Sequence, residues 1–276
     1  MSVPLTLGPR PDEPTPPITA GPRRYPEDVT ARLREEAGAI IARYPRARSA
    51  LLPLLHLVQG EDGYLTPAGI AFCATELDLS PAEVTAVATF YSMYRRTPTG
   101  EYLVGVCTTT LCAVMGGDAV LEALENHLGI AVGGTTDDGM VTLEHVECNA
   151  ACDYAPVVMV NWEFFDNQNP ATARQLVDDL RAGNPVAPTR GSALCTFRQT
   201  ARVLAGIVAP ADTAWQPGGP TVAGLDVARA QGMSAPRTDQ PPQPRDEPVA
   251  SAADAVRDQR APAPSEQVPP NGNGQR

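Results

Sequence analysis

The chain has 276 residues and a formal net charge of −11, and all 21 of its basic residues are arginine. Because lysine is absent, a phosphate-loop lysine and a Schiff-base lysine are both excluded. The acidic residues concentrate in 101–179, where 13 Asp and Glu accompany the single Arg174, so nucleic acid is an unfavourable partner and a basic protein surface a better match.

Proline marks the two ends of the chain. Of the 29 prolines, 8 fall in residues 1–26 and 12 in residues 210–276. We therefore predict a flexible arm over 1–26 and a disordered, proline-rich tail over 210–276, with the folded part between them. The first residues lack a signal sequence, and no run approaches the roughly 20 apolar residues that span a bilayer, so we expect a cytoplasmic protein. In that compartment cysteines serve as ligands or free thiols rather than disulfides.

The first folded segment, 27–96, is predicted to be a helical lobe. Apolar spacing indicates a helix over 27–43 and another over 49–58 that ends near Gly60. Two further short helices are announced by an N-cap followed by proline, and the second start also carries a capping box. These start signals are Thr66-Pro67 and Ser80-Pro81-Ala82-Glu83.

The next segment, 97–185, is predicted to be a small α/β sandwich (α+β). Short apolar runs indicate strands and helical spacing indicates two helices. The order is strand 102–106, helix 118–128, strand 141–147, strand 156–162, a fourth strand beginning at Phe164, and helix 171–182. An irregular extension is expected over 186–209.

Two pairs of cysteines follow predicted strands. Cys107 and Cys112 are separated by four residues, and Cys148 and Cys152 by three. Open α/β sheets bind ligands beyond the carboxyl ends of their strands, so we expect both pairs on one side of the sheet. Four thiolates arranged two by two suit a binuclear iron–sulfur cluster, and the same four would also suit a tetrahedral zinc.

Spacing alone leaves three interpretations open: a binuclear cluster, which it favours, a zinc site, and unconnected core cysteines. The pattern is neither a common zinc pattern, nor the redox pair with two intervening residues, nor the plant-type ferredoxin run. Small loop residues favour the cluster, because they let backbone amides approach sulfur. They are Thr108, Thr109, Thr110, Asn149, Ala150, Ala151 and the pair Gly116-Gly117.

Three stretches carry a resemblance to a known family. They are Phe90-Tyr91-Ser92-Met93-Tyr94, Gly105-Val106-Cys107-Thr108-Thr109-Thr110-Leu111-Cys112, and Glu147-Cys148-Asn149-Ala150-Ala151-Cys152-Asp153-Tyr154-Ala155-Pro156 with the following Val157-Val158-Met159-Val160-Asn161. Over about residues 25–185 the chain resembles the small flavoprotein-fragment subunit (the E subunit) of bacterial NADH-quinone oxidoreductase, respiratory complex I. The resemblance implies a thioredoxin-like fold with an N-terminal helical bundle and one [2Fe-2S] cluster. It implies that Cys107 and Cys112 bind one iron, and that Cys148 and Cys152 bind the other.

In the resembled family the cluster exchanges an electron with the flavin mononucleotide (FMN) of the NADH-oxidising F subunit, next to the iron–sulfur G subunit, in the peripheral arm of a proton-translocating complex. FMN and NADH are thus expected on the partner, and the isolated chain should not oxidise NADH because it has no Gly-rich dinucleotide fingerprint. The complex would lie on the cytoplasmic face of the plasma membrane, without direct insertion of this chain. Asn149-Ala150 stands where the family often has Leu-Gly, which implies an altered potential.

Two other functions compete with this one. The first is the equivalent subunit of an NAD-linked hydrogenase or formate dehydrogenase. The second, of another class, is a zinc-stapled scaffold protein without a redox role.

The remaining candidate residues have simpler interpretations. We predict that His56 and His127 are structural histidines with satisfied hydrogen bonds, and that Cys73 and Cys195 are core or loop thiols. His145 is expected to be a strand residue, with a hydrogen bond toward the cluster as the alternative. The sequence allows two interpretations for each of two segments. Residues 90–94 either pack in the core or contact a partner. The acidic segment 101–179 is either a solvated face or a docking face.

Overall fold

The computed structural model describes residues 16–208 and 219–233. Contacts divide the chain into two units, 1–222 and 223–276, and each is considered by itself. Most of the predicted arm and tail lies outside the described residues. Within the predicted tail, residues Gly219–Ala230 form helix α9.

Part of the predicted arm, 16–26, lies against the helical lobe. Ile18 and Tyr25 pack on the core of that lobe. The Pro22 carbonyl accepts a hydrogen bond of 2.9 Å from the Ala68 amide. Thus apolar contacts and a backbone hydrogen bond order this part, which composition alone predicted to be flexible.

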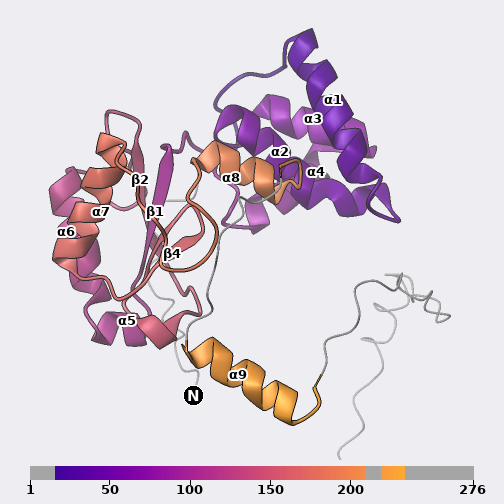
Figure 1. The fold of residues 1–276 in the computed structure, drawn as a ribbon. Helices are drawn as coiled ribbons and strands as arrows, with labels where there is room; N and C mark the ends of the chain where they lie inside the picture. The colour runs from indigo at the N-terminus through magenta and orange to yellow at the C-terminus, as the bar shows by residue number, and fades with distance from the viewer. Residues whose placement is uncertain (1–15, 209–218, 234–276) are drawn as a thin grey trace, which may run out of the picture. The chain divides into compact units, whose positions relative to one another are not determined.

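The helical lobe contains the four predicted helices (Figure 1). The Thr66 side chain caps one helix by accepting from the Gly69 amide at 3.2 Å, and Ser80 and Glu83 form the predicted capping box of the next. The local start signals are therefore confirmed. The bounds are α1 Glu27–Ile41, α2 Leu51–Asp62, α3 Pro67–Leu77 and α4 Pro81–Phe90, with a short 3-10 helix, Ala47–Ala50, before α2.

Helix α2 continues beyond Gly60, where the sequence predicted its end. The extension is not irregular throughout, since Phe197–Leu204 form helix α8, which packs on α2. A Cβ atom at Gly60 would lie 2.9 Å from Arg202 Cγ, so glycine allows this close crossing. Helix α2 ends instead before Gly63, which has a left-handed φ of +82°.

A four-stranded sheet forms the second part of the fold, in the order β2-β1-β3-β4. Strand β1 (Tyr102–Cys107) runs parallel to β2 (Val141–Val146) and antiparallel to β3 (Val158–Val160). Strand β4 (Glu163–Phe165) pairs antiparallel with β3. The predicted succession of strands and helices in this segment is confirmed, with strand β3 shorter than predicted.

Two helices cover one face of this sheet and lie side by side (Figure 1). They are α6 (Gly117–Leu128) and α7 (Pro170–Ala182), whose predicted C-caps, Gly129 and Gly183, are both left-handed. Val104 and Val106 of β1 pack into the core beneath them. Because side chains alternate along a strand, Cys107 belongs to the other set of β1 residues, with Leu103 and Gly105.

Asn161 ties the sheet to the extension. Its side chain is fully buried and accepts a hydrogen bond from the Leu103 amide at 2.8 Å. Its amide nitrogen donates to the Glu101 carbonyl at 3.1 Å and to the Cys195 carbonyl at 2.8 Å. One side chain thereby satisfies three backbone groups from two distant segments.

His56 differs from its prediction. It lies in α2 and is only 6% exposed, and its Nδ1 atom is buried without a hydrogen-bond partner among the described residues. Its ring centroid lies 5.0 Å from that of Tyr94. Burial lowers the pKa of His56 to about 4, so this histidine is neutral at pH 7.

We predict that His56 makes folding stability fall in mild acid. Between about pH 6.5 and pH 4 the unfolded chain binds a proton that folded His56 resists, so stability is full above this window and is lost on descending through it. At pH 4.5 the loss from this residue is about 2–3 kcal/mol. Urea unfolding at pH 7 and pH 4.5 should therefore show a smaller pH effect in His56→Phe than in the wild type. An equal pH effect in both proteins would contradict the assignment.

Candidate metal centre

The pairing of three strands places the cysteines at one edge of the sheet. Cys107 ends β1 opposite Val146, which ends β2, so Cys148 follows at the same edge. The Cys107 amide donates to the Val157 carbonyl at 3.2 Å, which puts the start of β3 at that edge too. Cys152 opens the 3-10 turn Cys152–Tyr154 that leads into β3. Both cysteine pairs thus lie on one side of the sheet, as the strand order predicted.

The first pair is buried. Helix α5 (Leu111–Val114), which the sequence did not predict, carries Cys112 back toward Cys107, and the two residues are 2% and 3% exposed. Burial raises the pKa of the Cys112 thiol to about 11, and a hydrogen bond with Cys107 and the charges of Cys107 and Cys152 act in the same direction. A hydrogen bond with the Val157 backbone acts in the opposite direction and lowers this pKa. Cys107 of the same pair and Cys152 of the other pair are therefore both close to the Cys112 thiol.

The second pair is exposed. Cys148 and Cys152 both reach the surface, and the Cys148 sulfur accepts a hydrogen bond from the Ala150 amide at 3.3 Å. Ala150 has a left-handed φ of +51°, a conformation that favours glycine. The resembled family often has glycine at this position, so the loop keeps its shape here at some cost in strain.

Gly117 allows α6 to begin directly against the buried pair. A Cβ atom at Gly117 would lie 2.5 Å from the Cys107 carbonyl oxygen and 2.9 Å from that of Cys112. Only glycine fits such a space, which confirms the predicted close approach of the backbone. The first turn of α6 consequently lies against the backbone of both buried cysteines.

Arg190, in the extension, holds the turn that carries Cys152. Its guanidinium forms a two-pronged ion pair with Asp153 at 2.9 and 3.1 Å and another bond with Asp166 at 2.8 Å. It also lies over the rings of Tyr154 and Phe164, about 5 Å from each centroid. The extension is thus part of the site, which the sequence did not indicate, because these partners are 24 and 37 residues apart.

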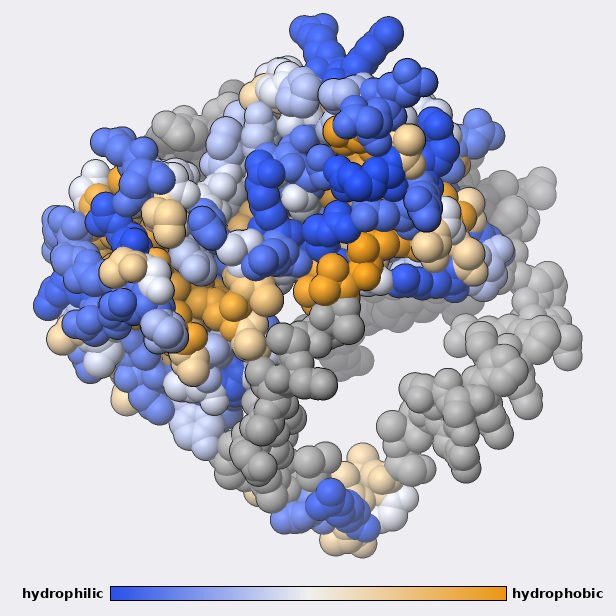
Figure 2. Space-filling model, turned by 45° about the horizontal axis from the view of Figure 1, so that its top comes forward, coloured by the Kyte–Doolittle hydropathy of each residue, from blue (hydrophilic) through white to orange (hydrophobic). Residues whose placement is uncertain are grey.

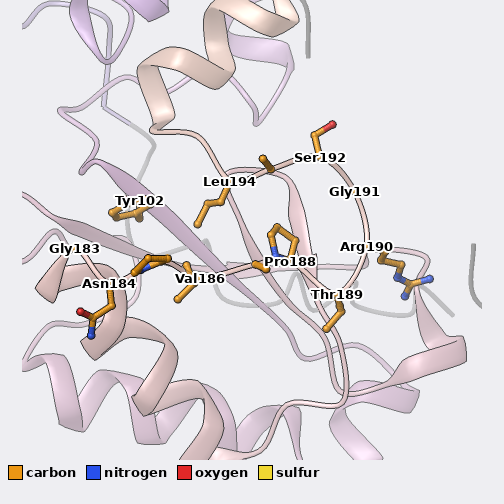
Figure 3. A pocket seen from close by; sticks show the side chains of 13 residues that line it. Tyr102, Gly183, Asn184, Val186, Pro188, Thr189, Arg190, Gly191, Ser192 and Leu194 are labelled. Carbon is orange, nitrogen blue, oxygen red and sulfur yellow. The ribbon is translucent and has the colours of Figure 1, made fainter. Parts of the chain in front are cut away.

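The extension also lines a cavity of about 660 Å³ (Figure 3). It lies between Tyr102 and the loop 183–194, and no cysteine lines it. Arg190 extends from its rim away from the lining side chains Val186 and Leu194. This cavity is therefore separate from the thiol site.

The sequence singled out other cysteines and histidines besides the four proposed ligands, and none of them forms a hydrogen bond with these four cysteines among the described residues. Cys73 is fully buried in the helical lobe, and Cys195 lies in the extension with its thiol bonded to the Ala193 carbonyl at 3.5 Å. His127 joins α6 to α7 through a bond of 2.7 Å to Asp178. His145 lines a cavity of about 640 Å³ together with Cys148, but its ring makes no hydrogen bond to the described residues, so its bond toward the cluster stays a prediction.

The donor set fits two irons held in pairs. Among residues 16–208 and 219–233, no group of three or more His, Cys, Asp or Glu is placed so that it could hold a metal ion. The thiols come instead as one buried pair and one exposed pair at a single edge, which matches the two ligands per iron of a binuclear cluster.

Comparison with known proteins agrees with this geometry. Residues 37–181 match the family described as thioredoxin-like [2Fe-2S] ferredoxin. The NADH-quinone oxidoreductase E subunit of Mycobacterium tuberculosis (strain ATCC 25618 / H37Rv) is 65% identical over 237 residues, which cover 85% of this chain and 94% of the relative. The chain belongs to this E-subunit family. The predicted family, fold class and [2Fe-2S] cluster are thereby confirmed.

Two further similarities are more limited. The mitochondrial NADH dehydrogenase [ubiquinone] flavoprotein 2 of Dictyostelium discoideum is 36% identical over 58% of this chain and 66% of that protein. A solved structure of an NAD+-reducing [NiFe]-hydrogenase in the air-oxidized state shares 24% identity, with a TM-score of 0.45 over 49% of this chain and 23% of that one.

We predict that the Arg190 contacts keep the Cys152 turn closed around its iron. Arg190→Ala removes both ion pairs and should speed the loss of the visible cluster absorbance to an iron chelator by about tenfold, a usual effect of losing a partner of a metal ligand. Arg190→Lys keeps the positive charge but cannot form the bidentate ion pair. Its rate of cluster loss should therefore lie between the rates of the wild type and Arg190→Ala.

Arg181→Ala is the matched control for this measurement, because Arg181 pairs with Asp138 on an exposed surface and contacts none of the four cysteines. Equal rates of cluster loss in Arg190→Ala and Arg181→Ala would show that the extension does not hold the site.

Proposed function

We propose that the chain carries its [2Fe-2S] cluster on Cys107 and Cys112 at one iron and on Cys148 and Cys152 at the other, and exchanges an electron with a flavin on a partner protein. The observation that supports the proposal is the strand pairing, which brings the segments that carry these two cysteine pairs to one edge of the sheet. When bound, the cluster takes up and returns one electron, and no proton transfer by the protein is needed.

The two pairs have different surroundings. Cys107 and Cys112 are enclosed by protein, whereas Cys148 and Cys152 are exposed. The chain therefore shields one iron from water and leaves the other near the surface.

Apolar residues beside the buried pair support a partner surface. Three exposed apolar residues lie within three positions of Cys112 in the chain. They are Leu111, Val114 and Met115, which are 40%, 81% and 58% exposed. On the face shown in Figure 2, apolar residues gather in separate patches among hydrophilic ones. A compact group of exposed large apolar side chains usually marks a protein contact. We assign this group to the flavin- and NADH-binding F subunit, with the iron–sulfur G subunit as a second neighbour in the assembly.

The location follows from the assembly. No helix in the described residues is long and apolar enough to cross a membrane. We propose that the chain is held at the cytoplasmic face of the plasma membrane through its partner subunits, which would make the full complex, rather than this chain alone, the enzyme that oxidises NADH.

We predict that replacing a ligand removes or strongly shifts the spectrum of the cluster. Cys107→Ser and Cys152→Ser take a thiolate from different irons, so each should abolish or shift the electron paramagnetic resonance (EPR) signal of the reduced full-length protein. Cys195→Ser, outside the proposed ligand set, should leave the signal intact. An unchanged signal in either ligand variant would remove that cysteine from the ligand set.

We also predict that a charge on the apolar group weakens assembly without affecting the cluster. Val114→Glu would bury a carboxylate at the contact and should weaken binding of the flavin-binding partner at least tenfold in a co-purification titration. Val132→Glu is the control, because Val132 is also exposed, at 43%, but follows the far end of α6. Unimpaired assembly of the Val114 variant would place the contact elsewhere.

A further inference from the structure

The side-chain nitrogen of Asn149 is a buried donor without an acceptor. Among the described residues, Asn149 Nδ2 is inaccessible to solvent and has no hydrogen-bond partner. Leaving such a group unpaired costs about 1–3 kcal/mol. Folded proteins rarely keep this cost, so an unpaired buried donor generally indicates a partner that has not been placed.

The position of Asn149 restricts what that partner is. The residue directly follows Cys148 in the loop that ends at Cys152, and the rest of the loop is alanine, which offers no side-chain acceptor. The loop already folds around sulfur, because the Ala150 amide donates to Cys148 Sγ at 3.3 Å. Asparagine has a short side chain that bonds within its own loop. The residue directly before Asn149 in the chain is Cys148, whose sulfur is an acceptor of hydrogen bonds in this loop.

The same position differs from the resembled family, which often has leucine there. Leucine has similar size but no hydrogen-bond donor. The protein atoms of the described residues leave the Asn149 donor unpaired, whereas a bound cluster would bring sulfide and thiolate sulfur into the loop. The amide and the cluster therefore suit each other in charge and in place.

Resting on the proposed function, we propose that Asn149 Nδ2 donates a hydrogen bond to a sulfur of the [2Fe-2S] cluster and raises its reduction potential. One-electron reduction adds negative charge to iron and sulfur. A donor directed at sulfur stabilises the reduced form more than the oxidised form, so the potential rises. Asn149 is in this respect a determinant of how readily the cluster accepts an electron.

The first test is a redox titration of the cluster-loaded full chain with dithionite, with the reduced state measured by EPR. At the potential that half-reduces the wild type, Asn149→Leu should have about a tenfold lower ratio of reduced to oxidised cluster, which for one electron corresponds to about 59 mV. Asn149→Asp has a side chain of the same shape but lacks the donor. Its ratio of reduced to oxidised cluster should also be lower than that of the wild type. Asn184→Leu is the control, because Asn184 is exposed and bonds to Asp179 at the end of α7.

The second test detects the contact in the wild type, and Asn149→Leu identifies the residue responsible. Asparagine labelled with ¹⁵N in its side chain should give a hyperfine coupling to the reduced cluster in pulsed EPR, and the coupling should vanish in Asn149→Leu. Absence of the coupling, or equal potentials in the wild type and both Asn149 variants, would overturn the inference alone. A wild-type chain that takes up no [2Fe-2S] cluster would overturn the proposed function as well.

Discussion

The parallel pairing of β1 with β2 is the constraint on which the site depends. It sets Cys107 opposite Val146, so that the first thiol and the loop of Cys148 leave the sheet at the same edge. If the register of β1 shifted by one residue, Cys107 would turn toward the core beneath α6 and α7, and Val106 would take its place at the site. The buried valines Val104 and Val106 oppose that shift, because it would remove them from the apolar core.

Around this pairing, distant segments hold the loops in place. Gly117 lets α6 begin against the first pair, and Arg190 grips the turn of Cys152 through Asp153. Asn161 joins both strand β1 and the extension. The extension then continues into α8, which packs on α2 of the helical lobe. A segment without a predicted structure thus connects the lobe with the metal centre.

Sequence reasoning succeeded where the determining forces are local. The caps at Thr66 and Ser80 and the strand periods each depend on a few neighbouring residues, and the structure shows them as predicted. It failed where tertiary packing decides. Gly60 has the local character of a helix end, but α8 crosses at that point and the helix continues. Likewise, Arg190 and Asp153 have no local signature as a pair, and nothing around His56 in the sequence indicates a buried ring nitrogen without a partner.

The central claim is that the four cysteines hold two irons bridged by sulfide. Its most direct test is the analysis of metal and acid-labile sulfide in the full-length protein purified without oxygen. The account predicts about two irons and about two sulfides per chain, with little zinc. About one zinc per chain without sulfide would contradict it, because a single ion on the same thiols would leave the protein with no electron to carry.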